Sequence, residues 1–331
     1  MIQKPSHIII SRTDSIGDVM LTLPMTGFLK SIFPEIKISF IGRSYTQAII
    51  ESCTHVDDFI NWDRVCKLSS EEQISVLRST NADVIIHVFP EKEVMTIAKK
   101  AGIKHRIATG RRWHSLSTCN HPVFFSRKKS DLHESQLNFK LLRPFGITDI
   151  PSTQVIADYS GFQATDNDLS KWNNILHSPY PKIILHTLSK GSAVNWSFAQ
   201  FEQLAETCIH QGWQVIISGT APEGERIRAE SKLLQMNVYD LTGQLSLSQF
   251  ISFIGKCDAL VAASTGPLHI ASALGIEALG LYSPKRPIHP GRWAPIGKKA
   301  NFFVAKEHPE SGVLEISANA VFDFLNARVT N

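Results

Sequence analysis

Residues 6–24 read SHIIISRTDSIGDVMLTLP, which combines a short apolar segment, a polar loop and a second apolar segment. The first segment, residues 6–11, is rich in β-branched residues, which favour a strand. The second continues as VMLTLPMTGFLKSIF, whose apolar side chains recur at helical intervals and predict a helix over 19–33. The stretch therefore predicts a strand, a loop and a helix, in that order.

The same alternation recurs along the whole chain. Strand patterns follow at 36–42, 82–89 and 105–110, with helical patterns at 44–52 and 91–102, and the second half repeats the rhythm with strand patterns at 182–189, 213–219, 237–243, 258–264 and 277–283. Parallel strands need helical crossovers, so the alternation predicts two doubly wound α/β domains. The segment 149–181, with three prolines, is the expected boundary region.

Length and composition narrow the class of protein. The chain has 331 residues, of which 43% are hydrophobic and 19% charged, which suits two globular domains and excludes a disordered or collagen-like chain. No apolar run is long enough to cross a bilayer, and the start does not have the pattern of a signal peptide. Five cysteines without a close pair indicate neither a disulfide framework nor a zinc site. We therefore expect a cytoplasmic protein.

Positive charge is concentrated in the first half of the chain. Residues 1–150 hold 20 Lys and Arg against 15 Asp and Glu, whereas residues 151–331 hold 14 against 15. Between Glu93 and Asp131 there are nine basic residues and no acidic one. This stretch predicts a surface that attracts anions, and a solvated basic face without a partner is the alternative. No nucleic-acid recognition motif accompanies it.

Ligands of open α/β sheets bind where strands end, so the loops after strands are the candidate sites. The loop SRTDSIGD (11–18) holds two carboxylates, Asp14 and Asp18, and Gly17, which permits a tight turn and close approach of a substrate. Either carboxylate alone is equally suited to capping the following helix. The loop lacks the G-x-G-x-x-G pattern, which argues against a nicotinamide cofactor.

A second loop, HTLSKGSAVNW (186–196), follows another predicted strand. The hydroxyls of Thr187 and Ser189 and the cation of Lys190 suit a phosphate oxygen. An unoccupied polar loop remains an equal alternative.

A third loop, ASTGPLH (263–269), leads from a strand into a helix. Gly266 and Pro267 suit the start of that helix, whose free N–H groups would bind an anion. His269 lies in the first turn and is more typical of a structural hydrogen bond than of an acid or base. The loop KRPIHPGRW (285–293) adds basic residues that either assist this site or form a basic surface loop.

Taken together, these segments resemble glycosyltransferase family 9, the ADP-heptose:lipopolysaccharide heptosyltransferases. RTDSIGDVMLTLP (12–24) is similar to the amino-terminal signature of that family. LTGQLSLSQFISFIGKCDALVAASTGPLHIASALGIEALGLYSP (241–284) is similar to its nucleotide-binding segment, and DLHESQLNFKLLRPFGI (131–147) resembles its helix before the linker.

The resemblance implies a GT-B fold, in which two Rossmann-like doubly wound domains face each other across a cleft. It implies an acceptor-binding domain over 1–160, a linker over 161–181 and a nucleotide-sugar-binding domain over 182–305. The remaining residues, 306–331, would hold a C-terminal helix, with a return of that helix to the first domain left open.

The resemblance also assigns roles to the candidate residues. Asp18 takes the place of the general base, which accepts the proton of the acceptor hydroxyl as that oxygen attacks the anomeric carbon. The donor is expected at Thr187, Ser189, Lys190, Glu223, Ser264, Thr265, Gly266, Pro267 and His269. The acceptor is expected at Arg12, Asp14, Gly17, Arg111 and Arg112.

Two positions depart from the family pattern. Ser264 stands where the family usually has Asp, and Val194 stands where it usually has a phosphate-binding Lys, for which Lys190 is a candidate substitute. The expected donor is therefore ADP-heptose, with another nucleotide sugar as the alternative. The same features also suit a nucleotide-sugar epimerase or hydrolase, or a nucleotide-sugar binder without catalytic activity.

The resemblance also implies a reaction that inverts the anomeric centre without a bound metal or other cofactor. Independently, no histidine or carboxylate cluster in the sequence has metal-ligand spacing. The expected acceptor is the anionic inner core of lipopolysaccharide, which the basic stretch 93–131 would attract. Phe124 and Phe125, beside Arg127, suit contact with acyl chains or headgroups. Peripheral attachment to the inner face of the cytoplasmic membrane follows as an expectation.

Overall fold

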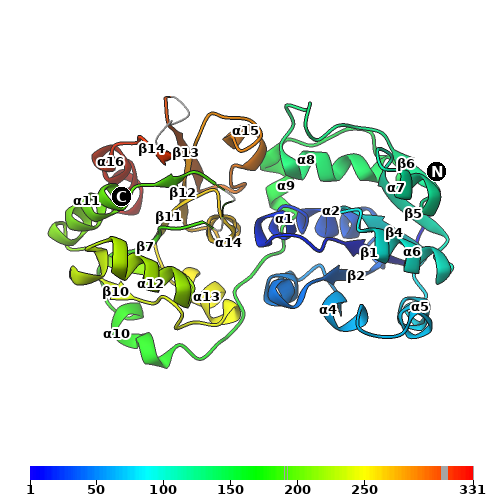
Figure 1. The fold of residues 1–331 in the computed structure, drawn as a ribbon, viewed down its shortest axis with the longest axis horizontal. Coiled ribbons are helices and arrows are strands. Elements are labelled where there is room, and N and C mark those ends of the chain that lie inside the picture. The colour runs from blue at the N-terminus through cyan, green and yellow to red at the C-terminus, as the bar shows by residue number, and fades with distance from the viewer. Residues whose placement is uncertain (190, 192, 307–311, 331) are drawn as a thin grey trace. The chain divides into compact units, whose positions relative to one another are not determined.

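The computed structural model describes residues 1–189, 191, 193–306 and 312–330, and the chain divides into two compact units, Met1–Gln163 and Ala164–Asn331. Each unit is built on a six-stranded sheet covered by helices (Figure 1). The division falls close to the predicted domain limit at residue 160. Two doubly wound α/β units are what the alternating sequence pattern predicts.

The sheet of the first unit has the strand order β3-β2-β1-β4-β5-β6, and all its pairs are parallel. Its strands are β1 (His7–Ser11), β2 (Lys37–Gly42), β3 (Asp58–Asn61), β4 (Val84–His87), β5 (His105–Thr109) and β6 (His121–Val123). Strand β1 lies at the centre and is buried along its whole length, because helices cover both faces of the sheet. The order of the strands reverses between β1 and β4, so a binding crevice is expected where these two strands end.

Helices of the first unit cover both faces of this sheet. On one face, Ile9, Ile41 and Ile85 of the sheet form a buried cluster with side chains of α4, α5 and α6. On the other, α2, α8 and α9 pack against one another. The helices are α1 (Ile16–Met20), α2 (Pro24–Ile32), η1 (Ser44–Thr46), α3 (Gln47–Glu51), α4 (Trp62–Val65), α5 (Ser70–Ser79), α6 (Lys92–Lys100), α7 (Trp113–Thr118), α8 (Glu134–Phe139), η2 (Lys140–Phe145) and α9 (Thr153–Asp158).

The prediction of a single helix over 19–33 is wrong in one respect, because the structure has two helices in this region. Helix α1 ends at Met20, and α2 begins at Pro24 after a turn in which the amides of Thr22 and Leu23 both donate to the carbonyl of Val19. Proline has no N–H and cannot continue a helix, whereas it suits the first helical position. Pro24 therefore restarts the helix rather than lying inside it.

The sheet of the second unit repeats the topology of the first, with the order β10-β9-β7-β11-β12-β13 and parallel pairing throughout. Its reversal falls between β7 and β11. The strands are β7 (Lys182–His186), β9 (Gln214–Ser218), β10 (Tyr239–Asp240), β11 (Ala259–Ala263), β12 (Glu277–Tyr282) and β13 (Ala300–Val304), with β8 (Asn195–Trp196) and β14 (Val313–Leu314) forming a separate pair.

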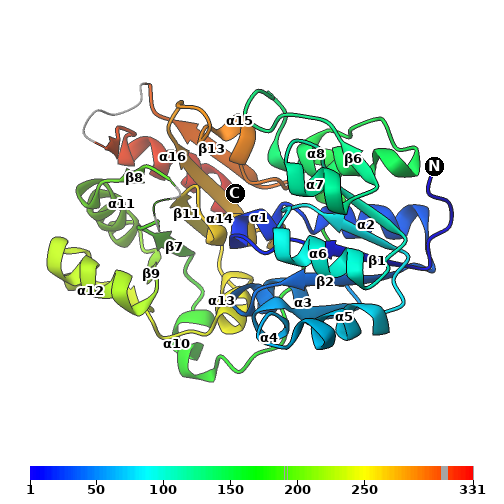
Figure 2. The same ribbon diagram turned by 45° about the vertical axis from the view of Figure 1, so that its right-hand side comes forward.

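The C-terminal helix belongs to the second unit. Val321, Phe322 and Leu325 of α16 are buried in the same cluster as side chains of α11 and of the second sheet, and the two helices lie side by side (Figure 2). A return of this helix to the first domain, which the sequence leaves open, stays a prediction. The helices are η3 (Ser170–Trp172), α10 (Asn173–Leu176), α11 (Phe198–His210), α12 (Ala221–Glu230), η4 (Leu233–Gln235), α13 (Leu247–Ile254), α14 (Gly266–Leu274), α15 (Pro290–Trp293) and α16 (Ala318–Val329).

All five cysteines are free, as their spacing predicts, and burial raises the pKa of the Cys208 thiol to about 12. Across the described ranges, no helix combines the length and the apolar character that a membrane crossing requires.

His87, at the end of β4, is a buried polar residue inside the first unit. Its side chain is fully buried, and neither ring nitrogen has a hydrogen-bond partner among the described residues. Burial, with a smaller contribution from Arg106, lowers its pKa from 6.5 to about 3. The folded chain therefore holds this imidazole neutral at pH values where the unfolded chain protonates it.

This difference predicts a pH-dependent stability. Between about pH 6.5 and pH 3 the unfolded chain binds the proton and the folded chain does not, so His87 lowers the free energy of unfolding as the pH falls, by up to about 1.4 kcal/mol per pH unit. We expect His87→Leu to lose this part of the slope when denaturant unfolding is measured from pH 7 to pH 4. His177→Leu, at an exposed histidine, is the matched control. If the free energy of unfolding depends on pH in His87→Leu as it does in the wild type, His87 is not the source of this pH dependence.

Candidate active site

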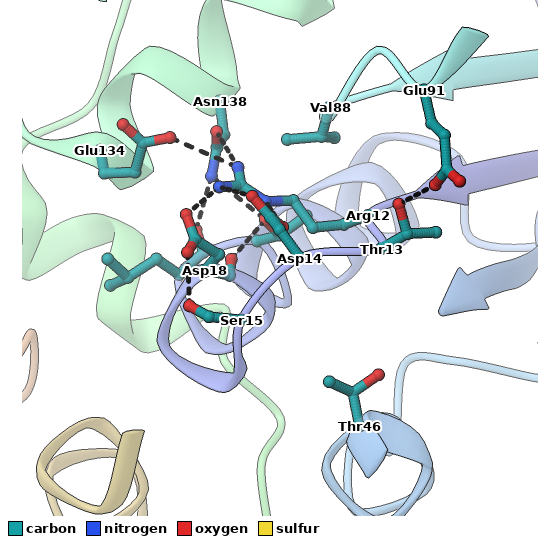
Figure 3. Close-up of polar contacts among 12 residues, drawn as sticks. Arg12, Thr13, Asp14, Ser15, Asp18, Thr46, Val88, Glu91, Glu134 and Asn138 are labelled. Atoms are coloured by element: carbon teal, nitrogen blue, oxygen red, sulfur yellow. Dashed lines mark hydrogen bonds and ion pairs between the residues drawn. The ribbon is translucent and has the colours of Figure 1, made fainter. Parts of the chain in front are cut away.

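Arg12, the first residue after β1, organises the polar edge of the first unit (Figure 3). Its guanidinium donates to Asp14 through Nε at 2.7 Å and Nη2 at 3.1 Å, and Nη2 also donates to Asp18. Nη1 donates to Glu134 at 3.3 Å and to Asn138 at 3.2 Å. Arg12 is only 3% exposed, and its donors are directed to groups of the chain itself. Arg12 was expected to bind the acceptor, but in the structure it positions Asp14 and Asp18.

Nearby carboxylates stabilise the positive charge of Arg12. Burial opposes the charge, but attraction from Asp18, Asp14 and Glu134 outweighs burial and raises the pKa of the guanidinium further above its ordinary value. For Asp14, burial raises the pKa of the carboxyl, and Arg12 offsets part of that effect. One buried cation is thus surrounded by three carboxyl groups.

Asp18 is held by two hydrogen bonds. It is the third residue of α1, where one oxygen of its carboxylate accepts from Arg12 and the other accepts from the Ser15 hydroxyl at 2.5 Å. Its side chain retains 16% exposure. A carboxylate oxygen can accept about two hydrogen bonds, so each oxygen of Asp18 retains capacity for a further donor. The group is fixed in orientation and accessible, as a general base requires.

Gly17 has a different local role from the tight turn that the sequence suggests. It lies inside α1, and its carbonyl accepts from the Leu21 amide at 3.0 Å as part of the helix. The glycine is half-buried, so close approach of a substrate stays a prediction.

A second polar network adjoins the first at the same end of the sheet. Thr13 donates to Glu91, which follows β4, and Arg43, which follows β2, donates to Glu91 at 2.7 Å and to Asp63 at 2.9 Å. The Tyr45 hydroxyl donates to the backbone carbonyl of Asp14 at 2.5 Å. Arg43, Tyr45, Asp63 and Glu91 were missed in the sequence, although Arg43 directly follows β2 and Glu91 lies in the loop after β4, positions that could have indicated these two.

Arg111 and Arg112 follow β5, at the end of the sheet where Asp18 lies, and both are exposed. Arg112 donates weakly to the carbonyl of Pro90 at 3.4 Å and lies 6.0 Å from the centre of the Phe89 ring. The two arginines are therefore exposed to solvent, with Arg112 against the segment that leads to Glu91, and contact with an acceptor stays a prediction.

In the second unit, the predicted donor residues follow β7 and β11, which pair with each other at its reversal point. Thr265 precedes α14 in an extended conformation and does not cap the helix with its side chain. The hydroxyls of Thr187 and Thr265 are buried, and neither has a partner among the described residues. Two unpaired buried hydroxyls beside the free N–H groups of a nine-residue helix favour an anionic ligand.

The first residues of α14 are placed as the sequence predicts. Gly266 and Pro267 open the helix, and His269 is buried within its first turns at 5% exposure. Ser264 donates a hydrogen bond to the Tyr282 hydroxyl, which in turn donates to the Trp293 carbonyl at 2.6 Å. The serine at this position therefore ties β11 to the segment after β12.

The other predicted donor residues differ in their surroundings. Ser189 donates to the side chain of Asn195 at 2.8 Å, and Lys190 lies outside the described residues. Glu223 forms a capping box at the start of α12, where it accepts from the amide of Thr220 at 2.7 Å and from its hydroxyl at 2.9 Å. The helix-capping function of Glu223 is thus visible, and its contact with a nucleotide stays a prediction.

His186, at the end of β7, was not among the predicted site residues. Its Nδ1 lies 3.0 Å from the Ser218 hydroxyl, and burial lowers its pKa, with Glu223 opposing part of the shift. A neutral imidazole therefore lies directly before Thr187.

GT-B glycosyltransferases, a class of nucleotide-sugar transferases, are built from two Rossmann-like units. This chain has two such units, one with a carboxylate held by a buried arginine and one with unpaired hydroxyls at a helix start. A sequence profile described as Glycosyltransferase family 9 (heptosyltransferase) matches residues 74–317. The chain belongs to glycosyltransferase family 9, and it is a heptosyltransferase-like enzyme.

Known proteins show the same relationship. The chain is 28% identical over 299 residues to a Haemophilus influenzae protein provisionally named a glycosyltransferase, covering 87% of this chain and 86% of that protein. It is 35% identical over 101 residues to lipooligosaccharide heptosyltransferase 2 of the same organism, covering 29% of each chain.

Solved structures share the fold. A glycosyl transferase family 9 structure from Veillonella parvula superposes with a TM-score of 0.78 at 16% identity, covering 98% of this chain and 97% of that one. The Escherichia coli ADP-heptose lps heptosyltransferase II superposes with a TM-score of 0.75 at 19% identity, covering 98% of each chain. The predicted fold class is confirmed.

Proposed function

We propose that this enzyme transfers a heptose, with inversion, from ADP-heptose to a hydroxyl of the inner core of lipopolysaccharide. The observation that carries the proposal is the Asp18 carboxylate, which is held in place by Arg12 and Ser15 and remains accessible. Relatives support the choice of substrates, because they are named lipooligosaccharide and lipopolysaccharide heptosyltransferases.

In the proposed reaction, the first unit binds the acceptor and supplies the base. The acceptor hydroxyl hydrogen-bonds to Asp18, which accepts the proton as the oxygen attacks the anomeric carbon of the donor. The new carbon–oxygen bond forms as the bond from that carbon to the diphosphate breaks. A single displacement of this kind inverts the anomeric centre, and the electron pair of the broken bond moves to a phosphate oxygen.

The second unit stabilises the leaving diphosphate in this proposal. The free N–H groups at the start of α14 and the unpaired Thr187 and Thr265 hydroxyls would donate to the phosphate oxygens on which negative charge develops. These groups donate without a metal, so the proposed reaction uses no metal or other cofactor. A different nucleotide sugar is the alternative donor, because Ser264 offers a hydroxyl where the family usually has a carboxylate.

The acceptor is lipid-linked in this proposal, so the first unit would contact the membrane surface that holds it. Trp113 is 89% exposed, Leu116 45% and Phe124 64%, and the Phe124 ring lies against Gly110 at the end of β5. Exposed aromatic residues beside basic ones are typical of proteins that bind anionic membrane surfaces.

The first test removes the proposed base. We expect Asp18→Asn to lower turnover by roughly 10² or more, because an amide cannot accept the proton, while ADP binding in the second unit stays close to wild type. Steady-state transfer to a lipopolysaccharide core acceptor measures the effect, with Asp149→Asn in an exposed loop as the matched control. Wild-type turnover in Asp18→Asn would reject the proposed mechanism.

The second test concerns the donor. We expect ADP to bind more tightly than GDP or UDP, and Thr265→Val to weaken ADP binding about tenfold without a loss of stability, because the hydroxyl has no partner among the described residues. Titration calorimetry measures both, with Thr207→Val on α11 as the control. Equal affinity of Thr265→Val and wild type for ADP contradicts the proposed phosphate contact, and preference for another nucleotide favours the alternative donor.

The third test concerns the membrane. We expect the enzyme to float with vesicles that contain anionic phospholipid, to be released by high salt, and to bind roughly tenfold less when Trp113 is replaced by Ser. Tyr180→Ser is the matched control, since Tyr180 is 58% exposed in the second unit. Equal binding to neutral and anionic vesicles, or no effect of Trp113→Ser, contradicts this contact.

A further inference from the structure

Glu134 is the most deeply buried of the three carboxylates around Arg12. Its side chain is 1% exposed, whereas those of Asp14 and Asp18 are 24% and 16% exposed. It lies at the start of α8 and accepts from Arg12 at 3.3 Å. A group this buried is shielded from an acceptor sugar, and its contact with Arg12 is a route by which Glu134 can act on Asp18.

A second arginine stands behind Glu134. Arg127 donates to the same Glu134 oxygen that Arg12 contacts, and Asn138 accepts from both guanidinium groups at 3.2 Å. The Asn138 amide in turn donates to the backbone carbonyl of Leu21 at 3.0 Å, just beyond the end of α1. The charges therefore alternate in order from Arg127 through Glu134 and Arg12 to Asp18. Figure 3 shows Glu134, Arg12 and Asp18.

We propose that Glu134 is a positioning residue that sets the orientation and basicity of Asp18 through Arg12, with Arg127 as its counter-charge. The inference deepens the proposed function and rests on the role of Asp18 as the base.

The physical reason is that one guanidinium is shared among three carboxylates. Glu134 and Asn138 engage Nη1, which leaves Nη2 directed at Asp18 and fixes the plane of the guanidinium. The negative charge of Glu134 also offsets part of the positive potential that Arg12 and Arg127 create at Asp18. Charges in a low-dielectric interior act over several ångströms. Removal of the charge of Glu134 or of Arg127 therefore changes the electrostatic potential at Asp18, and the two removals change it in opposite directions.

Several charged groups face this cluster from the elements around it, and any pH dependence contains their contributions. They are Arg12, Asp14, Arg43, Tyr45, Glu91, Arg127 and Glu134.

The test uses two charge-removing variants with opposite expected effects. Glu134→Gln removes a negative charge, which favours ionised carboxylates, so the acidic limb of the kcat/KM profile moves to lower pH by about half a unit to one unit. Arg127→Gln removes a positive charge, so the same limb moves to higher pH by a similar amount. We expect kcat at the plateau to fall about three- to tenfold in Glu134→Gln, because a weaker base catalyses less well, while the KM for the donor stays unchanged.

Opposite shifts of the acidic limb distinguish this inference from a purely structural function of Glu134. If the substitutions only loosened α8, the acidic limb would shift in the same direction in both variants. Glu71→Gln, on the exposed side of α5, is the matched control and is expected to keep the wild-type profile. The inference is overturned if the acidic limb of the kcat/KM profile stays in place in both variants, or if it moves in the same direction in both. If Glu134→Gln does not fold, a shift to higher pH in Arg127→Gln supports the inference, and an unmoved limb overturns it. Full turnover in Asp18→Asn would instead reject the proposed function itself.

Discussion

The first unit depends on a buried cation, the guanidinium of Arg12, that is surrounded by carboxylates. A buried charge is stable only when its partners compensate for lost hydration, and removal of one partner from such a group typically costs about 3–5 kcal/mol. Arg12 meets this requirement with Asp14, Asp18 and Glu134, which come from the loop after β1, from α1 and from α8. The same contacts that keep Arg12 charged also hold Asp18 in one orientation. The stability of this edge and the fixed orientation of Asp18, the proposed base, therefore have a common cause.

The two units share one strand order but differ in the chemistry at the reversal point. Ionised side chains in mutual contact dominate where β1 and β4 end, whereas unpaired hydroxyls and free helix N–H groups dominate where β7 and β11 end. Satisfied charges suit the handling of a proton, because their positions are fixed by strong contacts. Unsatisfied donors suit an anionic ligand, because the ligand supplies the hydrogen bonds that the chain leaves unmade. The fold thus repeats while the function of each site differs.

The basic residues between Glu93 and Asp131 fall into two groups in the structure, those that pair inside the unit and those that are exposed to solvent. Arg106 donates to the backbone carbonyls of Thr118 and Ile103, and Arg127 pairs with Glu134, so these two arginines stabilise the interior of the unit. The other seven basic residues of the stretch are exposed: Lys99, Lys100, Lys104, Arg111, Arg112, Lys128 and Lys129. Their charge is available to a partner, whereas Arg106 and Arg127 are committed to the chain. The charge pattern of the sequence does not distinguish the two groups, because burial and hydrogen bonding in the folded chain decide which side chains are paired.

By itself, the sequence determined the strands near the centre of each sheet and the loops that follow them, because alternation of apolar segments and positions of glycine and proline are local properties. It also placed Asp18, Thr187 and Thr265 at strand ends. It missed β3, β6 and β13, which are short or partly exposed strands at or next to sheet edges and lack a strong apolar pattern. Only the tertiary structure decided that Glu134 and Asn138, more than 100 residues from Arg12, share its guanidinium, and that α16 packs on α11. These contacts follow from burial and packing between distant segments, which no local pattern encodes.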